Sequence, residues 1–164
     1  MTCENLSSQN SISTPKVFIS YCWTNEEHEQ RVLDFASQLR NDGINAVLDQ
    51  WDLNPGNDIN FFIEKSITDP DIKKILVICD HGCQLKANKR NGGIRIETQL
   101  IAKSVYADVA QEKVIPVVFE NDDGGNPCVP HYLSSRMCID LSTDEKYKEN
   151  YKVLVRNLYG KPAL

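Results

Sequence analysis

The chain has 164 residues, 41% hydrophobic and 25% charged, a composition typical of one globular domain with an ordinary core. Its net charge of −5 argues against a nucleic-acid partner, because non-specific binding to phosphates depends on Lys and Arg. The apolar runs are too short to span a membrane and the N-terminus is polar, so we expect no membrane anchor and no secretion signal, and predict a cytoplasmic protein.

The N-terminal part of the sequence predicts a tail, a strand and a helix. Residues 1–15 are rich in Ser, Thr, Asn and Gln, and such a segment buries too little apolar surface to offset its ordering entropy, so we expect a flexible tail. Residues 16–21 form an apolar run that is typical of a strand buried on both faces. Thr24 and Glu27 fit a capping box at the start of a helix, whose apolar spacing continues to a favourable C-cap at Asp42-Gly43.

Strands and helices are predicted to alternate along the rest of the chain. Further strands are expected at residues 44–48, 75–79, 114–119 and 136–139, further helices at residues 59–67, 95–109 and 144–159, and loops at residues 49–58, 80–93 and 122–130. This alternation predicts one α/β domain over residues 16–160. We expect a flavodoxin-like parallel sheet of five strands in the order 2-1-3-4-5, with helices on both faces.

Six cysteines occur in the chain, and some of them could be interpreted as metal ligands. Cys79, His81 and Cys83 are close in sequence and could be completed by Cys128 or His131. Structural zinc sites usually contain two tight ligand pairs, whereas here a single close pair of cysteines directly follows an apolar strand. We therefore predict no metal, and buried, reduced thiols that pack as small apolar side chains.

Three segments, in this order, resemble the TIR domain family. Val17-Phe-Ile-Ser-Tyr-Cys-Trp-Thr-Asn25 resembles the first box of TIR and SEFIR domains, a buried strand that ends in Ser-Tyr and precedes an acidic helix. Asp49-Gln-Trp-Asp-Leu-Asn-Pro-Gly-Asn-Asp58 is similar to the BB loop after the second strand. Gly92-Gly-Ile-Arg-Ile-Glu97 resembles the entry to the αC helix of enzymatic TIR domains. The Phe-Trp pair of animal receptors is missing near Phe119, so the resemblance is to the bacterial, SEFIR-like branch.

The resemblance implies that the chain hydrolyses NAD+ with Glu97 as its catalytic carboxylate. The nicotinamide leaving group of NAD+ is already cationic, so its N-glycosidic bond breaks without a general acid. The oxocarbenium-like transition state needs a nearby carboxylate, as in glycoside hydrolysis. The second product would be linear or cyclic ADP-ribose, with NAD+ as the substrate and no cofactor.

The sequence around Glu97 also allows a structural role. Glu97 falls between Leu100 and Ile101 on the helical wheel, inside the apolar arc, where a carboxylate is either paired or directed at a cleft. A Glu in the first turn of a helix is favoured by the macrodipole, and Arg95 could pair with it. Ile94-Arg95-Ile96 stands where enzymatic TIR domains commonly have a Trp-Cys pair.

Substrate contacts are expected at the carboxyl ends of the first two strands, where open α/β sheets bind ligands. The candidate residues are Ser20, Tyr21, Cys22 and Trp23 after the first strand, and Asp49 and Trp51 after the second. An aromatic side chain at this edge could stack on nicotinamide or adenine. Trp23 could equally pack as a hydrophobic staple against the first helix, and Trp51 could fold back over the core.

The loop at residues 49–58 is also expected to mediate self-association. The candidate assembly residues are Asp52, Leu53, Asn54, Pro55 and Gly56, with Trp51 as an exposed aromatic anchor. The alternative function is a non-enzymatic TIR or SEFIR interaction module that uses the same loop. The resemblance implies bacterial immune signalling (antiphage defence) with a fused or separate sensor module, and we interpret residues 161–164 as the start of a truncated linker to it.

Two other protein classes share the predicted sheet. In response-regulator receivers a phosphoacceptor Asp follows the third strand, as Asp80 does here, but Ser20-Tyr21-Cys22 occupies the place of the acidic pair that such receivers also need. Nucleoside deoxyribosyltransferases share the sheet and a catalytic carboxylate, and are a more distant alternative. His28 lies among glutamates and is expected to be solvated, whereas His81 follows a strand and could contact a ligand.

Overall fold

The computed structural model describes residues 14–22, 24–48, 56, 65, 69–89, 113–130, 133 and 137–160, without the side chains of residues 86–89. The strands are β1 (Lys16–Ser20), β2 (Asn45–Val47), β3 (Ile72–Cys79), β4 (Val114–Val118) and β5 (Ile139–Asp140). The helices within these residues are α2 (Glu26–Asn41), α5 (His81–Lys89) and α7 (Asp144–Leu158). Of the helix predicted at residues 59–67 only Lys65 is described, and it is helical, whereas the helix predicted at residues 95–109 lies outside the described residues. No helix of the described segments is long and apolar enough to cross a membrane.

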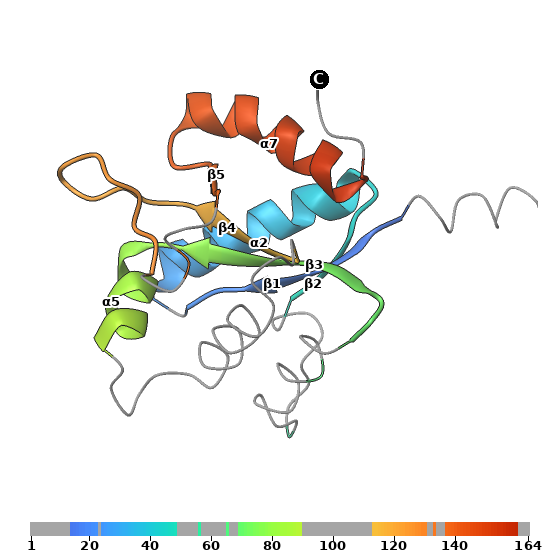
Figure 1. Ribbon diagram of the computed structural model, residues 1–164, viewed down its shortest axis with the longest axis horizontal. Coiled ribbons are helices and arrows are strands. Elements are labelled where there is room, and N and C mark those ends of the chain that lie inside the picture. The colour runs from blue at the N-terminus through green and yellow to red at the C-terminus, as the bar shows by residue number, and fades with distance from the viewer. Residues whose placement is uncertain are drawn as a thin grey trace, which may run out of the picture.

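The described strands form one parallel sheet in the order β2-β1-β3-β4-β5. Because the strands are parallel, their carboxyl ends lie along one edge of the sheet, at the left of Figure 1. Helices α2 and α7 lie on one side of the sheet, and α5 follows the carboxyl end of β3 on the other side (Figure 1). The predicted flavodoxin-like fold is confirmed.

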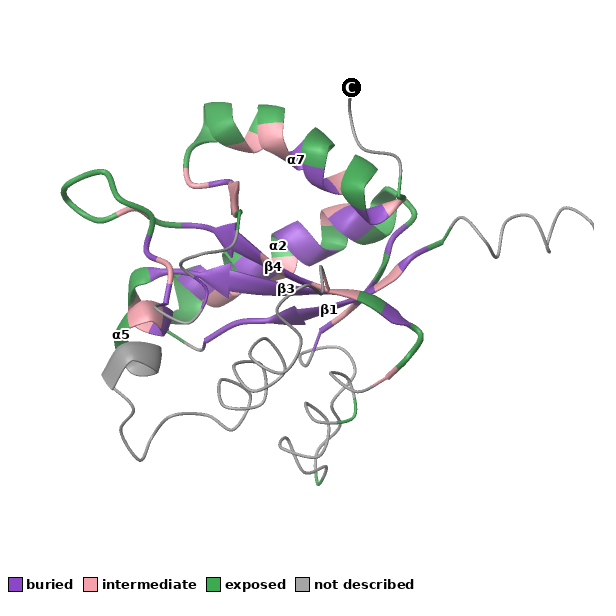
Figure 2. Cartoon of the chain, viewed as in Figure 1, coloured by how far each residue is buried: buried purple, intermediate pink, exposed green. Residues whose placement is uncertain are grey.

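The strand side chains alternate between two apolar cores. Val17 and Ile19 of β1 belong to the core beneath α2 and α7, together with Leu154 of α7. Phe18, between them in sequence, belongs to the second core with Ile75 of β3. Figure 2 shows the strands largely buried and the outer surfaces of α2 and α7 exposed. Burial on both faces explains why the strands are continuous apolar runs and not alternating patterns.

Helix α2 begins one residue later than its sequence pattern predicts. Its N-cap is Asn25, whose side chain accepts a hydrogen bond from the backbone N–H of His28 at 2.8 Å, so the prediction that Thr24 is the cap was wrong. The predicted C-terminus is confirmed, because Asp42 caps the helix and Gly43 follows it. Gly43 has a φ of 87°, a left-handed value that favours glycine at this position.

Helix α5 replaces the first part of a predicted loop. The Asp80 side chain caps it by accepting the backbone N–H of Cys83 at 3.0 Å, and the Glu120 side chain accepts the backbone N–H of His81 at 2.9 Å. Glu120 lies 39 residues further along the chain. The sequence around α5 therefore gives no local signal for one of the two carboxylates that stabilise its first turn.

Strand boundaries differ from the predictions by a few residues. β3 begins at Ile72 and not at residue 75, because it continues through the polar Lys73 and Lys74. β5 consists of Ile139–Asp140 and leaves out Met137 and Cys138, which were predicted to belong to it. Each deviation lies at the end of a strand, so the order of the strands is unaffected.

Candidate functional site

The carboxyl edge of the sheet is where this topology is expected to bind a ligand. β1 is flanked by β2 on one side and β3 on the other, so the strand order changes direction there, and open α/β sheets bind ligands outside such a point. Ser20 at the end of β1 pairs with Val77 near the end of β3. The segments that follow, beginning with Tyr21 and Asp80, therefore leave the sheet next to each other.

The predicted substrate residues that the structure describes are buried at this edge. Ser20, Tyr21 and Cys22 all belong to the buried interior, and the Tyr21 ring lies 6.4 Å from the imidazole of His28, measured between ring centroids. Direct contact with a ligand would require a local movement of these residues. Trp23, Asp49 and Trp51 lie outside the described residues, as does Glu97.

The predicted assembly loop is represented by Gly56. Its φ is 90°, a left-handed value, and a Cβ added there would meet nothing within 4 Å. This φ agrees with the predicted Pro-Gly turn, because the third residue of a type II turn needs a positive φ. Asp52, Leu53, Asn54 and Pro55 lie outside the described residues.

A hydrogen bond joins the segment after β1 to the segment after β3. The Thr24 hydroxyl donates to Oδ2 of Asp80 at 2.8 Å, while Oδ1 of the same carboxylate accepts the Cys83 N–H at 3.0 Å. Asp80 is only 3% exposed. Both oxygens thus bind donors of the chain itself, which leaves the carboxylate inaccessible to a phosphate donor and removes support for the receiver alternative.

His28 is buried, against the prediction of a solvated side chain. It is 6% exposed, its Nδ1 lies 3.7 Å from Oδ2 of Asp80, and its Nε2 has no hydrogen-bond partner. Burial lowers the pKa of His28 below 6.5, although the negative charge of Asp80 acts in the opposite direction. We therefore treat His28 as neutral at pH 7, and its contact with Asp80 as a polar contact and not an ion pair. The missed signal was its position four residues before the buried Val32, on the apolar face of α2.

The cysteines at this edge are reduced and inert. All five described cysteines are free, and Cys22, Cys79 and Cys83 are buried. A hydrogen bond with Cys22 and burial raise the pKa of the Cys83 thiol, and burial raises that of Cys79. Such thiols remain protonated at neutral pH and are poor nucleophiles. Among the described residues, no group of three or more His, Cys, Asp and Glu side chains could hold a metal ion.

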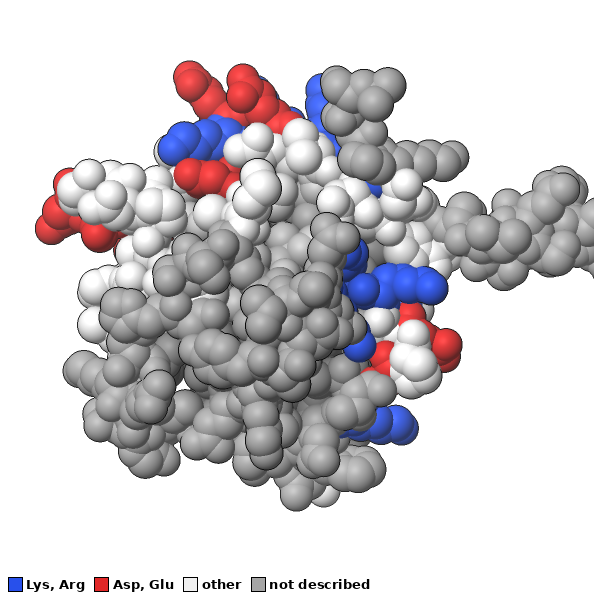
Figure 3. All heavy atoms as spheres, in the orientation of Figure 1, with Lys and Arg blue, Asp and Glu red and all other residues white. Residues whose placement is uncertain are grey.

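Acidic side chains dominate the described surface at this edge. Glu26, Glu27 and Glu29 occupy the first turn of α2, and Asp144 and Glu145 occupy the first turn of α7. Figure 3 shows acidic side chains over the start of α7 and over the loop after β4. They compensate the positive ends of the helix macrodipoles. Their combined field disfavours an anionic ligand wherever Lys or Arg does not offset it.

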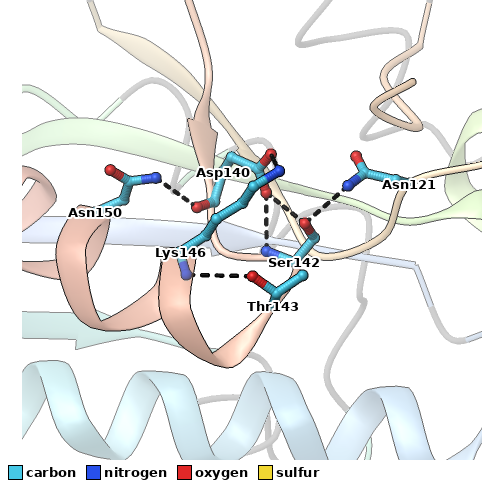
Figure 4. A network of polar contacts seen from close by, with 6 residues as sticks. All are labelled: Asn121, Asp140, Ser142, Thr143, Lys146 and Asn150. Carbon is cyan, nitrogen blue, oxygen red and sulfur yellow. Dashed lines mark hydrogen bonds and ion pairs between the residues drawn. The ribbon is translucent and has the colours of Figure 1, made fainter. Parts of the chain in front are cut away.

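A polar network joins the edge strand β5 to α7 (Figure 4). Oδ1 of Asp140 accepts the N–H and the hydroxyl of Ser142 at 2.9 and 2.6 Å, and its Oδ2 lies 3.2 Å from Nζ of Lys146. Burial opposes ionisation of Asp140, but these hydrogen bonds and the lysine lower its pKa below 3.8. Asn121 reaches the same Ser142 hydroxyl at 3.0 Å. Each group serves the turn between β5 and α7, so the network is structural.

A cavity of about 290 Å³ lies between α2 and α7. Phe35, Phe119 and Leu141 supply its apolar lining, and Arg31 and Tyr147 are among its polar side chains. The Arg31 guanidinium lies over the Phe119 ring, 4.6 Å from its centroid, and donates to the Phe119 carbonyl at 3.0 Å. Ser20, Tyr21 and Cys22, the substrate candidates that the structure describes, do not line this cavity, so it is separate from the described part of the candidate site.

Comparison with known proteins identifies the family. The sequence model of the TIR domain family matches residues 17–155. The chain belongs to the TIR domain family. The crystal structure of a prokaryotic SEFIR domain is 37% identical to it with a TM-score of 0.75, covering 92% of this chain and 96% of the other. The TIR domain of the Toll-related receptor TRR-2 from the lower metazoan Hydra magnipapillata is 20% identical with a TM-score of 0.61, covering 87% and 96%. No curated protein matches the chain.

The family match confirms the resemblance to TIR domains that was inferred from the sequence. The matched span of this TIR domain contains the segments at residues 17–25, 49–58 and 92–97 that carried the resemblance. The SEFIR likeness agrees with the branch inferred from the missing Phe-Trp pair. The Hydra TIR domain is too distant in sequence to indicate more than the shared fold.

Proposed function

We propose that this TIR domain hydrolyses NAD+ to nicotinamide and linear or cyclic ADP-ribose, with Glu97 as the catalytic carboxylate. The observation that carries the proposal is the TIR family match, whose span includes Glu97 and the segment that resembles the αC entry of enzymatic members. The strand order supports it, because the change of direction at β1 provides a ligand-binding position where Ser20 and Tyr21 leave the sheet.

The proposed chemistry needs few functional groups. Loss of nicotinamide leaves positive charge on the ribose, and the Glu97 carboxylate stabilises it until a nucleophile adds to the anomeric carbon and a proton is released. The nucleophile is water for linear ADP-ribose, and a ring nitrogen of the adenine of the same molecule for the cyclic product. No general acid is required, because the leaving group departs as a neutral pyridine. This requirement suits a chain whose Cys79 and Cys83 thiols are protonated and whose buried Asp80 accepts a hydrogen bond at each carboxylate oxygen.

We further propose that the TIR domain acts after self-association through residues 49–58, as a cytoplasmic signalling or defence domain that responds to a sensor module. Gly56 supports a defined turn in this loop, because its φ of 90° is unfavourable for other residues. Trp51 provides an aromatic side chain of the kind that dominates binding energy at protein interfaces.

Incubation of the purified chain with NAD+ tests the enzymatic proposal. We expect nicotinamide release by the wild type and its loss in Glu97→Gln, because the amide keeps the shape of the side chain but lacks the charge. Glu145→Gln is the matched control, since Glu145 is an exposed glutamate in the first turn of α7. Equal turnover of wild type and Glu97→Gln would contradict the assignment of Glu97.

A non-enzymatic interaction module is the second candidate. The burial of Ser20, Tyr21 and Cys22 and the acidic first turns of α2 and α7 favour it, because NAD+ carries a negatively charged pyrophosphate. Under this alternative the chain associates with itself but releases no nicotinamide. Assembly without nicotinamide release, at NAD+ concentrations well above about 1 mM, the upper end of typical KM values, would select the module.

A further inference from the structure

The end of the segment between β1 and α2 is held by a hydrogen bond to the side chain of Asp80, which follows β3. Thr24 follows the predicted substrate residues directly, and its hydroxyl donates to Oδ2 of Asp80 at 2.8 Å. Its backbone N–H donates to the Cys22 carbonyl at 2.9 Å. One side-chain bond thus fixes the end of a segment whose beginning is fixed by β1.

The Asp80 carboxylate, which accepts this hydrogen bond, cannot easily rotate away from Thr24. The second oxygen of Asp80 accepts the Cys83 N–H in the first turn of α5, and Asp80 itself is buried. Rotation of the carboxylate would therefore leave an α5 donor unsatisfied, which is costly in a buried place. Hydrogen bonds to an ionised acceptor are also stronger than those between neutral groups. Thr24 is thereby bound to a rigid, charged partner.

Gly82 makes room for this arrangement. A Cβ added at Gly82 would lie 2.5 Å from Oγ1 and 2.8 Å from Cγ2 of Thr24, so no larger side chain fits beside the bound threonine. Gly82 is helical and has no positive φ, so backbone conformation does not explain its presence. The close approach of Thr24 does explain it, and Thr24, Asp80 and Gly82 form one unit, here called the latch.

We propose that the latch is a positioning device for the proposed NAD+ site, with Thr24 and Asp80 fixing the end of the segment from Ser20 to Cys22. This inference rests on the proposed function for its enzymatic consequence, but the latch itself is a statement about the chain alone. Thr24 and Asp80 act through the residues between them and β1, so they are positioning residues and not catalytic ones.

His28 lies next to the latch and, when protonated, competes with Thr24 for Asp80. Nδ1 of His28 lies 3.7 Å from Oδ2 of Asp80, the same oxygen that Thr24 binds. The other charged groups acting on His28 are Glu120 after β4, and Glu29 and Arg31 on α2. Protonation of His28 adds a second, charged donor at Oδ2 and weakens the Thr24 bond by competition. The position of the segment from Ser20 to Cys22 should therefore depend on pH through His28.

Substitutions at Thr24 distinguish an effect of the latch from a general loss of stability. Thr24→Val removes the hydroxyl but keeps the shape and the cap that Asp80 gives to α5, whereas Thr24→Ser keeps the hydroxyl. Thr143→Val is the matched control, because the Thr143 hydroxyl caps α7 by accepting the Lys146 N–H at 3.2 Å, away from the latch. Two readouts are needed. One is KM and kcat for NAD+, and the other is the fluorescence of Trp23 as the single tryptophan in a Trp51→Phe background.

We expect Thr24→Val to raise KM about tenfold with a smaller change in kcat, as loss of a hydrogen bond to a charged group would. It should also shift the Trp23 emission and increase acrylamide quenching. Thr24→Ser should restore both readouts, and Thr143→Val should lower the melting temperature without changing either. In the wild type, Trp23 emission should titrate at a pH below 6.5 and should stop doing so in His28→Phe.

The outcomes distinguish this proposal from the proposed function. If the wild type releases no nicotinamide, the enzymatic proposal fails, while the fluorescence of Thr24→Val still decides whether the latch positions the segment. If Thr24→Val has wild-type KM and wild-type Trp23 fluorescence, the latch is overturned whatever the enzyme does. It is equally overturned if Thr143→Val changes both readouts as much as Thr24→Val, since the effect would then reflect stability.

Discussion

The buried His28 makes the stability of the folded protein depend on pH. Its pKa in the folded protein is lowered from 6.5 by burial, so the unfolded chain binds the proton more readily. The stabilising contribution of the neutral, buried His28 is therefore fully present above pH 6.5. It is lost as the pH falls through the lower pKa that His28 has in the folded protein. Asp140 titrates below 3.8 in the folded state and does not interfere in this range.

We predict that the wild type loses stability between pH 7 and pH 5, and that His28→Phe reduces this loss. The substitution keeps an aromatic ring beside Phe119, whose centroid lies 6.1 Å from that of His28, and removes the titrating group. Urea unfolding at several pH values measures the difference. An equally steep pH dependence in His28→Phe would mean that another group is responsible.

Gly82 and Thr24 should be energetically coupled. Gly82→Ala normally gains about 1 kcal/mol in a helix, but here the new Cβ collides with the Thr24 side chain, and overpacking costs about 1–3 kcal/mol. In a Thr24→Ala background only a contact of 3.2 Å to Cβ remains, so the same change should be tolerated better. A double-mutant cycle by urea unfolding should give a coupling above about 0.5 kcal/mol, and additive effects would refute the contact.

Helix α7 is attached to α2 by tyrosine hydroxyls as well as by its apolar face. Tyr147 donates to the Gln38 side chain, Tyr151 donates to the Asp42 carboxylate at 2.5 Å, and Tyr159 donates to the Asp42 carbonyl at 2.7 Å. The Tyr147 and Tyr151 rings stack with centroids 5.5 Å apart. The polar partners of these tyrosines lie more than a hundred residues away in the sequence, so no local pattern could have predicted them.

Tyr151→Phe should lower the free energy of unfolding by about 1–2 kcal/mol, because the lost bond has a charged acceptor. Tyr159→Phe is the control, since its bond is to a carbonyl in an exposed position and its loss should cost less. Urea unfolding at pH 7 compares the two variants. A larger loss in Tyr159→Phe than in Tyr151→Phe would contradict this account of the α2–α7 contact.

Elements that depend on local sequence were predictable, and those that depend on distant partners were not. β1 and α7 have continuous apolar runs or clear helical spacing, and were predicted to within a residue or two. α5 has Gly82 in its first turn and one buried side chain among the five described, so it gave no periodic signal. Its stability comes from Asp80 and Glu120 and from packing against Thr24, contacts that only the folded chain brings together.

The fold of the whole molecule was predictable because alternating strands and helices leave few topologies open. The same alternation located the carboxyl edge, and hence Ser20, Tyr21 and Cys22, without any structure. Burial of the strand over residues 16–21 and of the cysteines was also predicted, but not the side chains against which they pack, such as His28 beside Tyr21. The roles of Glu97, Trp51 and the rest of the 49–58 loop stay predictions.

Assembly should depend on the 49–58 loop without affecting the fold. Gly56→Pro cannot adopt the φ of 90° observed at this position, and Trp51→Ala removes the aromatic anchor. Gly56→Pro strains the backbone locally, but Gly56 is exposed and a Cβ there would meet nothing within 4 Å, so the monomer should stay folded. Light scattering should show weaker association of both variants, and wild-type association of either one would exclude that residue from the interface.

Specific activity measured against protein concentration is the most direct test of assembly-dependent NAD+ hydrolysis. A head-to-tail contact uses two different surfaces and propagates, so active material should accumulate only above a threshold concentration. We predict almost no nicotinamide release by the dilute monomer and a rise in specific activity that coincides with the rise in light scattering. Full activity in a strictly monomeric sample, or no nicotinamide release at any concentration despite assembly, would contradict it.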